Sequence, residues 1–163
     1  MQADRSTLFR RLEALGIDTV TVEHAPMFTV EQSRALRGRL PGAHTKSLFL
    51  IDKDGRMVLV VAKEDTRVDL KGLAARLNLG RLSFGKDALL EQVLGVTAGS
   101  VTPFALINES AREVAVVVDK ALLDFDEVNC HPLENTATTR LKTADLLRFI
   151  RACGHEPIVM PLV

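Results

Sequence analysis

The sequence predicts an α+β fold with a mixed, mostly antiparallel central sheet surrounded by helices. Apolar segments with the spacing of helices and of strands alternate irregularly along the 163 residues. The clearest strands are joined by hairpin turns, whereas a doubly wound parallel sheet would alternate strands and helices regularly. No repeat and no linker breaks this pattern, which predicts one domain over residues 1–163.

The first quarter of the chain begins with a helix and a short strand. Apolar residues recur at helical spacing: Leu8, Phe9, Leu12 and Leu15. They predict a helix over residues 7–15 that ends at Gly16, followed by a strand over residues 19–22. Residues 29–32 have the form of a capping box, Thr-Val-Glu-Gln, which predicts a second helix over residues 30–37.

A hairpin is the strongest local signal. Residues 46–52 and 56–62 are almost continuously apolar and flank Asp54-Gly55, a pair that accepts the positive φ angles of a tight turn. Continuous apolar character is typical of strands that are covered on both faces. We therefore expect this hairpin at the centre of the sheet.

The remaining elements follow the same two periodicities. The predicted elements are helices over residues 69–77 and 86–94, and strands over residues 82–84, 105–108 and 114–119. We expect the last two strands to pair through the loop at residues 109–113. Thr143 can cap a final helix with Asp145 in its first turn, and Gly154 ends it.

The composition argues against several classes of function. Lys and Arg number 21, as do Asp and Glu, so the formal net charge is zero, unlike that of a nonspecific nucleic-acid coat. The chain has no Trp and no Tyr, so a broad base-stacking platform is not expected. No signal peptide or membrane-length apolar segment is apparent, which predicts a cytoplasmic location and no membrane partner.

One segment is locally basic. Residues 33–51 contain no acidic side chain but four basic ones, namely Arg34, Arg37, Arg39 and Lys46. The segment is either a solvated helix face with its loop or a patch that grips phosphate groups.

Residues 129–139 concentrate polar groups: one imidazole, two carboxamides and three hydroxyls. They form either a heavily capped turn or the wall of a site. Pro132 restricts His131 to extended backbone, and Asn129 and Asn135 can satisfy main-chain groups nearby. A histidine held in this way can present one ring nitrogen while the other is tied down.

Two further segments are candidates to accompany this one. Residues 99–104 form either a stiff loop or a place where Gly99 lets a ligand reach the main chain, which could hold an ester carbonyl or an oxyanion. Lys46 at the start of the hairpin is either an edge charge or a cation aimed into a cleft, and Ser47 beside it offers a hydroxyl.

Known catalytic motifs are missing from the sequence. There is no Gly-x-Ser-x-Gly elbow, no Gly-rich phosphate loop and no His-Glu-x-x-His pair. A zinc site from Cys130, His131, Cys153 and His155 can be imagined, but its spacing is unlike that of zinc ligand pairs. We therefore expect neither a metal nor another cofactor.

Four segments, taken together with their order and spacing along the chain, resemble those of the free-standing prolyl-tRNA editing proteins of the YbaK/ProX group. These segments are residues 24–31, 46–50, 94–104 and 131–138. Within the group the chain is most similar to the alanyl-tRNA(Pro) deacylases. The Gly-Cys-Ser-Pro-like segment of the cysteine-specific branch is replaced here by Gly-Ser-Val-Thr-Pro at residues 99–103.

The resemblance implies hydrolysis of the ester that joins a wrong amino acid to the terminal adenosine of tRNA(Pro), without a covalent enzyme intermediate. By position, Lys46 would contact the terminal nucleotide, Gly99 would offer main-chain contacts near the ester, and His131 would help to form the pocket. The other residues implied in substrate binding are Ser47, Ser100, Val101, Thr102, Pro103, Phe104 and Asn135. The implied partners are the tRNA(Pro) acceptor end and prolyl-tRNA synthetase.

Two departures from the pattern keep an alternative open. Ser47 stands where Asn is common in this branch, and Cys130 stands where a larger residue is common. A module that binds a tRNA acceptor end or a synthetase without hydrolysis is the alternative function.

Overall fold

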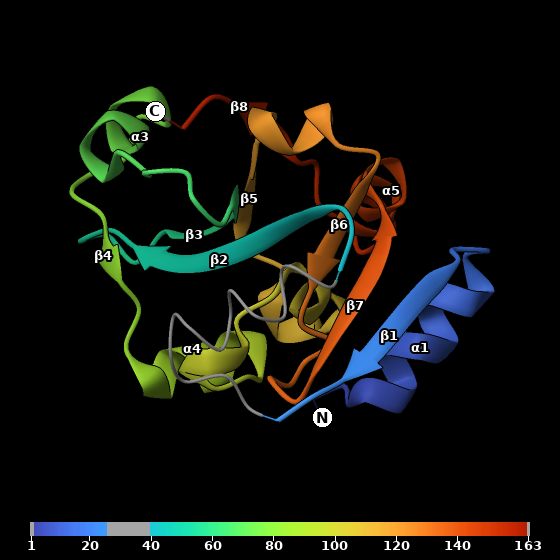
Figure 1. The fold of residues 1–163 in the computed structure, drawn as a ribbon. Helices are drawn as coiled ribbons and strands as arrows, with labels where there is room; N and C mark the ends of the chain where they lie inside the picture. Colours follow the sequence, from blue (N-terminus) through green and yellow to red (C-terminus); the bar gives the residue numbers. More distant parts are fainter. Residues whose placement is uncertain (1, 26–39, 163) are drawn as a thin grey trace.

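The computed structural model describes residues 2–25 and 40–162, and its centre is a mixed sheet (Figure 1). The strands lie in the order β1-β7-β6-β2-β3-β5-β8, and β4 pairs with β2. Their bounds are β1 Thr19–Glu23, β2 Ala43–Ile51, β3 Met57–Lys63, β4 Ser83–Phe84, β5 Ala115–Asp119, β6 Glu127–Cys130, β7 Ala137–Lys142 and β8 Ile158–Met160. Four of the seven pairings are antiparallel and three are parallel, which confirms the predicted mixed sheet.

The helices pack against both faces of this sheet. Their bounds are α1 Arg5–Ala14, α3 Leu70–Arg76, α4 Asp87–Leu94 and α5 Thr143–Ala152, with 3₁₀ segments η1 Ala98–Ser100, η2 Pro103–Ile107, η3 Glu109–Ala111 and η4 Lys120–Asp124. Figure 1 shows α3 on one side of β2 and β3 and α4 on the other. The larger core includes residues of α1, α4, α5 and η2, and the smaller core includes residues of α3.

The predicted hairpin is confirmed at the centre of the sheet. β2 and β3 pair from Thr45–Lys63 to Ile51–Met57, and Gly55 in the turn has a φ of 84°. Successive β3 residues alternate between the two cores, with Leu59 in the larger core and Val60 in the smaller one. Burial on both faces explains why these strands are apolar at nearly every position.

The described helices also lie close to where their periodicity predicts them. Gly95 ends α4 in the left-handed conformation, with a φ of 68°. Gly16 and Gly154 also have positive φ angles after α1 and α5. The predicted capping box and the helix over residues 30–37 lie outside the described residues, as do the three arginines of the basic segment.

The predicted strand over residues 105–108 is wrong, because this segment belongs to the 3₁₀ helix η2. The Thr102 hydroxyl oxygen accepts a hydrogen bond from the Phe104 N–H at 3.3 Å, and Pro103 occupies the first turn. A short apolar run fits a buried 3₁₀ turn as well as a strand. β5 therefore pairs in parallel with β3 and β8 instead of forming a second hairpin.

The predicted cap at Thr143 is also wrong. Lys142 is the N-cap of α5, without a side-chain capping bond, and Thr143 is the first helical residue. The Thr143 hydroxyl instead donates to the Phe125 carbonyl at 2.6 Å, which ties α5 to the segment before β6. Asp145 lies in the first turn as predicted.

Candidate functional site

A cleft of about 230 Å³ lies beside the N-terminal half of β2, next to β6. β2 pairs with β6 only at Ala43 and His44, and with β4 only at Leu50 and Ile51. Between these points this edge of β2 has no strand partner among the described residues. The cleft is lined by His44, Thr45, Lys46, Ser47, Glu64, Ala98, Gly99, Val101, Thr102, Pro103, Asn129, Cys130, His131 and Thr138. All three polar segments singled out in the sequence thus contribute to one cleft.

Lys46 stands on the β2 wall and is partly buried. Its ammonium donates to the Thr66 carbonyl at 2.6 Å, a contact that holds the side chain in place. An ammonium group has three N–H donors, so this bond leaves donors for a ligand. The main chain at Thr66 therefore fixes the Lys46 ammonium, and Lys46 lines the cleft.

Main-chain groups of β2 also face the open edge. The His44 carbonyl accepts from the Glu64 N–H at 2.9 Å, on the side of β3. Main-chain direction alternates along a strand, so Ser47 turns its N–H and C=O to the opposite side. Phe49 follows the same alternation, and its carbonyl accepts from the Gly85 N–H at 2.9 Å. Ser47 thus offers a main-chain donor and acceptor at the edge that borders the cleft.

Gly99 lies in η1 on the facing wall. A β-carbon placed on Gly99 would stand 3.3 Å from the carboxamide nitrogen of Asn135. This separation is tighter than most van der Waals contacts, so any side chain at residue 99 would press on Asn135. The two polar segments therefore meet at Gly99 and Asn135.

Three predicted binding residues, Ser100, Phe104 and Asn135, do not line the cleft. Ser100 is only 5% exposed, and its hydroxyl oxygen accepts from the Thr97 hydroxyl at 3.5 Å. Phe104 is fully buried and packs edge-to-face on Phe149, with ring centroids 5.4 Å apart. Val101, Thr102 and Pro103 do line the cleft.

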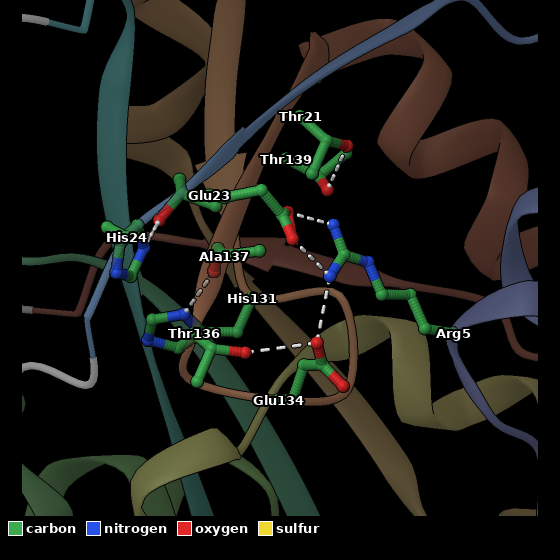
Figure 2. A network of polar contacts seen from close by, with 10 residues as sticks. Arg5, Thr21, Glu23, His24, His131, Glu134, Thr136, Ala137 and Thr139 are labelled. Carbon is green, nitrogen blue, oxygen red and sulfur yellow. Dashed lines mark hydrogen bonds and ion pairs between the residues drawn. The ribbon is translucent and has the colours of Figure 1, made fainter.

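His131 holds one ring nitrogen in place and leaves the other available (Figure 2). Its Nδ1 lies 3.2 Å from the Ala137 carbonyl, which can only accept, so Nδ1 carries the proton. Burial lowers the pKa of His131; the bond to Ala137 opposes this, and His24 adds to the lowering. A ring that favours the neutral form follows, and its Nε2 has no hydrogen-bond partner among the described residues, which agrees with the interpretation drawn from the sequence.

His24 and Thr138 were not predicted from the sequence as site residues. His24 Nδ1 donates to the Ala25 carbonyl at 2.8 Å, and its Nε2 lies 2.8 Å from the Thr138 hydroxyl on the cleft wall. The two residues are separated by 114 positions and are brought together by the pairing of β1 with β7. No local pattern around His24 indicates this contact.

Asn129 joins the two strands that border the cleft. Its carboxamide nitrogen donates to the carbonyls of Pro41 at 2.9 Å and Ala43 at 3.3 Å. The expectation that Asn129 satisfies main-chain groups is therefore confirmed. Its carboxamide oxygen is buried without a hydrogen-bond partner among the described residues.

Cys130 is buried and Cys153 is half-buried, and both are expected to be protonated thiols. Burial raises the pKa of Cys130 to about 12 and that of Cys153 to about 11. Cys130 also accepts a hydrogen bond from the Thr45 hydroxyl at 3.4 Å. Within residues 2–25 and 40–162, no three His, Cys, Asp or Glu side chains are placed to hold a metal ion. In the same part of the chain, no helix has the length and apolar character needed to cross a membrane.

Comparisons with known proteins identify relatives across almost the whole chain. Residues 24–149 match the sequence model of the family described as the aminoacyl-tRNA editing domain. The prolyl-tRNA editing protein ProX of Acetoanaerobium sticklandii is 35% identical over 93% of this chain and 93% of its own length. The prolyl-tRNA synthetase associated domain-containing protein 1 of Danio rerio is 37% identical over 96% of this chain and 86% of its own.

A solved structure shares the fold. A putative trans-editing enzyme for prolyl tRNA synthetase superposes with a TM-score of 0.74 at 21% identity. The match covers 99% of this chain and 98% of the other.

Proposed function

This chain belongs to the aminoacyl-tRNA editing domain family, and we propose that it is a trans-editing hydrolase that deacylates mischarged tRNA(Pro), with alanine as its preferred amino acid. The single observation that carries the proposal is the cleft that Lys46, Gly99 and His131 line together. The choice of tRNA(Pro) as the substrate is supported by the name of a relative, a prolyl-tRNA editing protein. The proposed partners are the tRNA(Pro) acceptor end and prolyl-tRNA synthetase, and the proposed location is the cytoplasm.

The β2 wall suits the terminal adenosine. Lys46 brings a fixed positive charge that can bind a phosphate or a ribose hydroxyl. Beside it, the Ser47 main chain offers one donor and one acceptor, which can pair with a nucleobase edge or the ribose. The Ser47 side chain is shorter than the asparagine common in this branch. We infer that the main chain of Ser47 binds the terminal adenosine, in place of the side-chain contact that an asparagine would make and that the shorter Ser47 hydroxyl cannot.

The Gly99 wall suits the scissile ester. Hydrolysis adds the elements of water across the ester: oxygen bonds to the carbonyl carbon, and the ribose oxygen leaves with a proton. Charge develops on the carbonyl oxygen during this step, and a main-chain N–H aimed at that oxygen stabilises it. Gly99 allows this close approach because it has no side chain, and Asn135 already fills the neighbouring space.

The neutral His131 and the protonated cysteines favour a mechanism without a covalent intermediate. Cys130 cannot act as a thiolate nucleophile with a pKa near 12. His131 can accept a hydrogen bond through Nε2 while Ala137 fixes the ring. In this proposal His131 shapes the pocket and orients water or the ribose hydroxyl.

Selectivity for alanine follows from size. A synthetase pocket built for proline cannot strongly reject alanine, because the lost apolar contacts are worth only ~1–3 kcal/mol. A second site that is too small for proline reverses that selectivity. Val101 and Pro103 line the cleft with apolar groups that can set this limit.

Replacement of Lys46 tests the proposal. Lys46→Ala should reduce alanine release from Ala-tRNA(Pro) roughly a hundredfold, which is typical for one lost electrostatic contact. The melting temperature should change little, because only one hydrogen bond, to Thr66, is lost. If Lys46→Ala unfolds the protein, Lys46 has a structural role instead. Tight tRNA binding by the wild-type protein without turnover of any aminoacyl-tRNA would select the alternative binding module.

A further inference from the structure

The turn at residues 131–136, between β6 and β7, carries His131 to the cleft and Asn135 to the neighbourhood of Gly99, in a strained conformation. His131 lines the cleft, and Asn135 lies against Gly99. Leu133 in the same turn has a φ of 72°, the left-handed region that residues with a β-carbon seldom adopt. Such a conformation persists only where surrounding contacts enforce it.

Leu133 packs against the larger core, and Arg5 of α1 adds polar contacts to the same turn (Figure 2). Its Nη1 donates to a Glu134 carboxylate oxygen at 2.9 Å and to a Glu23 oxygen at 2.8 Å, and its Nη2 donates to the other Glu23 oxygen. The Thr136 hydroxyl donates to the same Glu134 oxygen at 3.0 Å. One guanidinium therefore joins the helix, the end of β1 and the turn.

This network also reaches the second histidine. The His24 N–H donates to the Thr136 carbonyl at 2.9 Å, and the His24 ring lies 2.8 Å from the Thr138 hydroxyl. Glu23, which precedes His24 and is the last residue of β1, is bonded to Arg5. Arg5 itself does not line the cleft. Any effect of Arg5 on the cleft must therefore pass through the turn and the end of β1.

The helix that carries Arg5 is fixed independently of the turn. Asp4 caps α1 by accepting from the Thr7 N–H at 2.9 Å, and the Ala3 N–H donates to the Asn108 side chain at 2.6 Å. Leu8 and Leu12 are buried in the larger core at 0% and 2% exposure. Arg5 is thus held by a rigid element, and its guanidinium can impose a position on the turn.

We propose that Arg5 is a positioning residue, whose guanidinium clamps Glu134 and thereby holds the turn that presents His131 to the cleft and Asn135 to Gly99. A role in deacylation rests on the proposed function, whereas the clamp on the turn does not. The planar guanidinium bonds two carboxylates at fixed angles, which a lysine ammonium at the same place cannot reproduce.

Three variants and one matched control test the clamp. Arg5→Gln removes the guanidinium, Glu134→Gln removes the negative charge that it pairs with while it keeps the side chain the same size, and Arg5→Lys keeps the positive charge without the planar pair of N–H donors. Arg112→Gln removes an exposed arginine that pairs with Glu109 at 2.8 Å, away from the cleft. We expect kcat on Ala-tRNA(Pro) to fall about tenfold in Arg5→Gln and Glu134→Gln, because small misplacements of active groups slow catalysis strongly.

Further readouts separate positioning from a loss of fold. KM and melting temperature should change little, Arg5→Lys should recover only part of kcat, and Arg112→Gln should match the wild type. An NMR titration of the His131 ring should give a higher pKa in Arg5→Gln and Glu134→Gln, because a released turn exposes the ring to water.

Unchanged kcat and an unchanged His131 titration in both variants would overturn the clamp. A fall in melting temperature that accounts for the whole loss of activity, or equal losses in Arg112→Gln, would overturn it as well. If the wild-type protein releases no amino acid, the proposed function fails, and the His131 titration alone decides the clamp.

Discussion

The carboxamide nitrogen of Asn135 lies 3.3 Å from the position that a β-carbon on Gly99 would occupy. In the sequence, Gly99 precedes β5 and Asn135 follows β6. Each residue belongs to one of the polar segments identified in the sequence. Gly99 lines the cleft, and a side chain at this position would have to displace Asn135.

Gly99→Ala should therefore impair the cleft more than the fold. The new methyl group must push Asn135 aside by a few tenths of an ångström and narrow the approach to the main chain. Gly99 does not have a positive φ, so we expect the free energy of unfolding to change by less than about 1 kcal/mol. Alanine release from Ala-tRNA(Pro) should fall about tenfold.

The double variant Gly99→Ala/Asn135→Ala is the control for this explanation. Removal of the carboxamide makes room for the methyl group, so part of the lost activity should return. Wild-type activity in Gly99→Ala alone would show that no substrate group approaches Gly99 closely.

His131 should titrate below the usual histidine range. Burial disfavours the charged ring, so the folded protein binds this proton less well than the unfolded chain does. The stability that this ring contributes is therefore complete above about pH 6.5 and decreases as the pH falls below that value. A ¹³C-edited NMR titration measures the pKa directly, and a value above 6.5 would contradict a neutral, buried ring.

Thiol reagents should leave the proposed activity intact. Cys130 lines the cleft, but its thiol is buried and remains protonated, with a pKa raised to about 12. Treatment of the native protein with iodoacetamide near pH 8, followed by mass spectrometry, should find Cys130 unmodified and alanine release unchanged. Inactivation together with alkylation of Cys130 would assign this thiol a direct role.

Asn129 should matter chiefly to stability. Its side chain joins β6 to the carbonyls of Pro41 and Ala43, just before β2 and β6 separate. Asn129→Ala leaves the carbonyls of exposed Pro41 and buried Ala43 without this donor, so chemical denaturation should show a loss of about 1–3 kcal/mol. A loss below about 0.5 kcal/mol would mean that water satisfies both carbonyls.

The sequence predicted those parts of the fold that depend on local chemistry. Asp54-Gly55 between two apolar runs predicted the central hairpin, and the glycines after α1, α4 and α5 marked where those helices end. Residues 105–108 were misassigned because a buried 3₁₀ turn and a buried strand require the same apolar side chains. β6 and β7 were missed, because the polar residues that line the cleft interrupt their apolar pattern.

The sequence predicted some of the residues that line the cleft, but not all of them and not their arrangement. Lys46, Gly99 and His131 stood out by residue type and by their neighbours in the sequence, and one cleft contains all three. The Phe104 side chain points into the core because it packs against Phe149 in α5, and no local pattern in the sequence reveals this contact. The contact of His24 with Thr138 depends in the same way on strand pairing between distant segments.

The comparison of alanine with proline on the same tRNA tests the central claim most directly. Single-turnover rates of amino-acid release should be measured with Ala-tRNA(Pro) and Pro-tRNA(Pro) under identical conditions. The account predicts rapid release of alanine and at least a hundredfold slower release of proline, because the larger ring is excluded from the cleft. Equal rates for the two substrates, or no release of alanine, would contradict it.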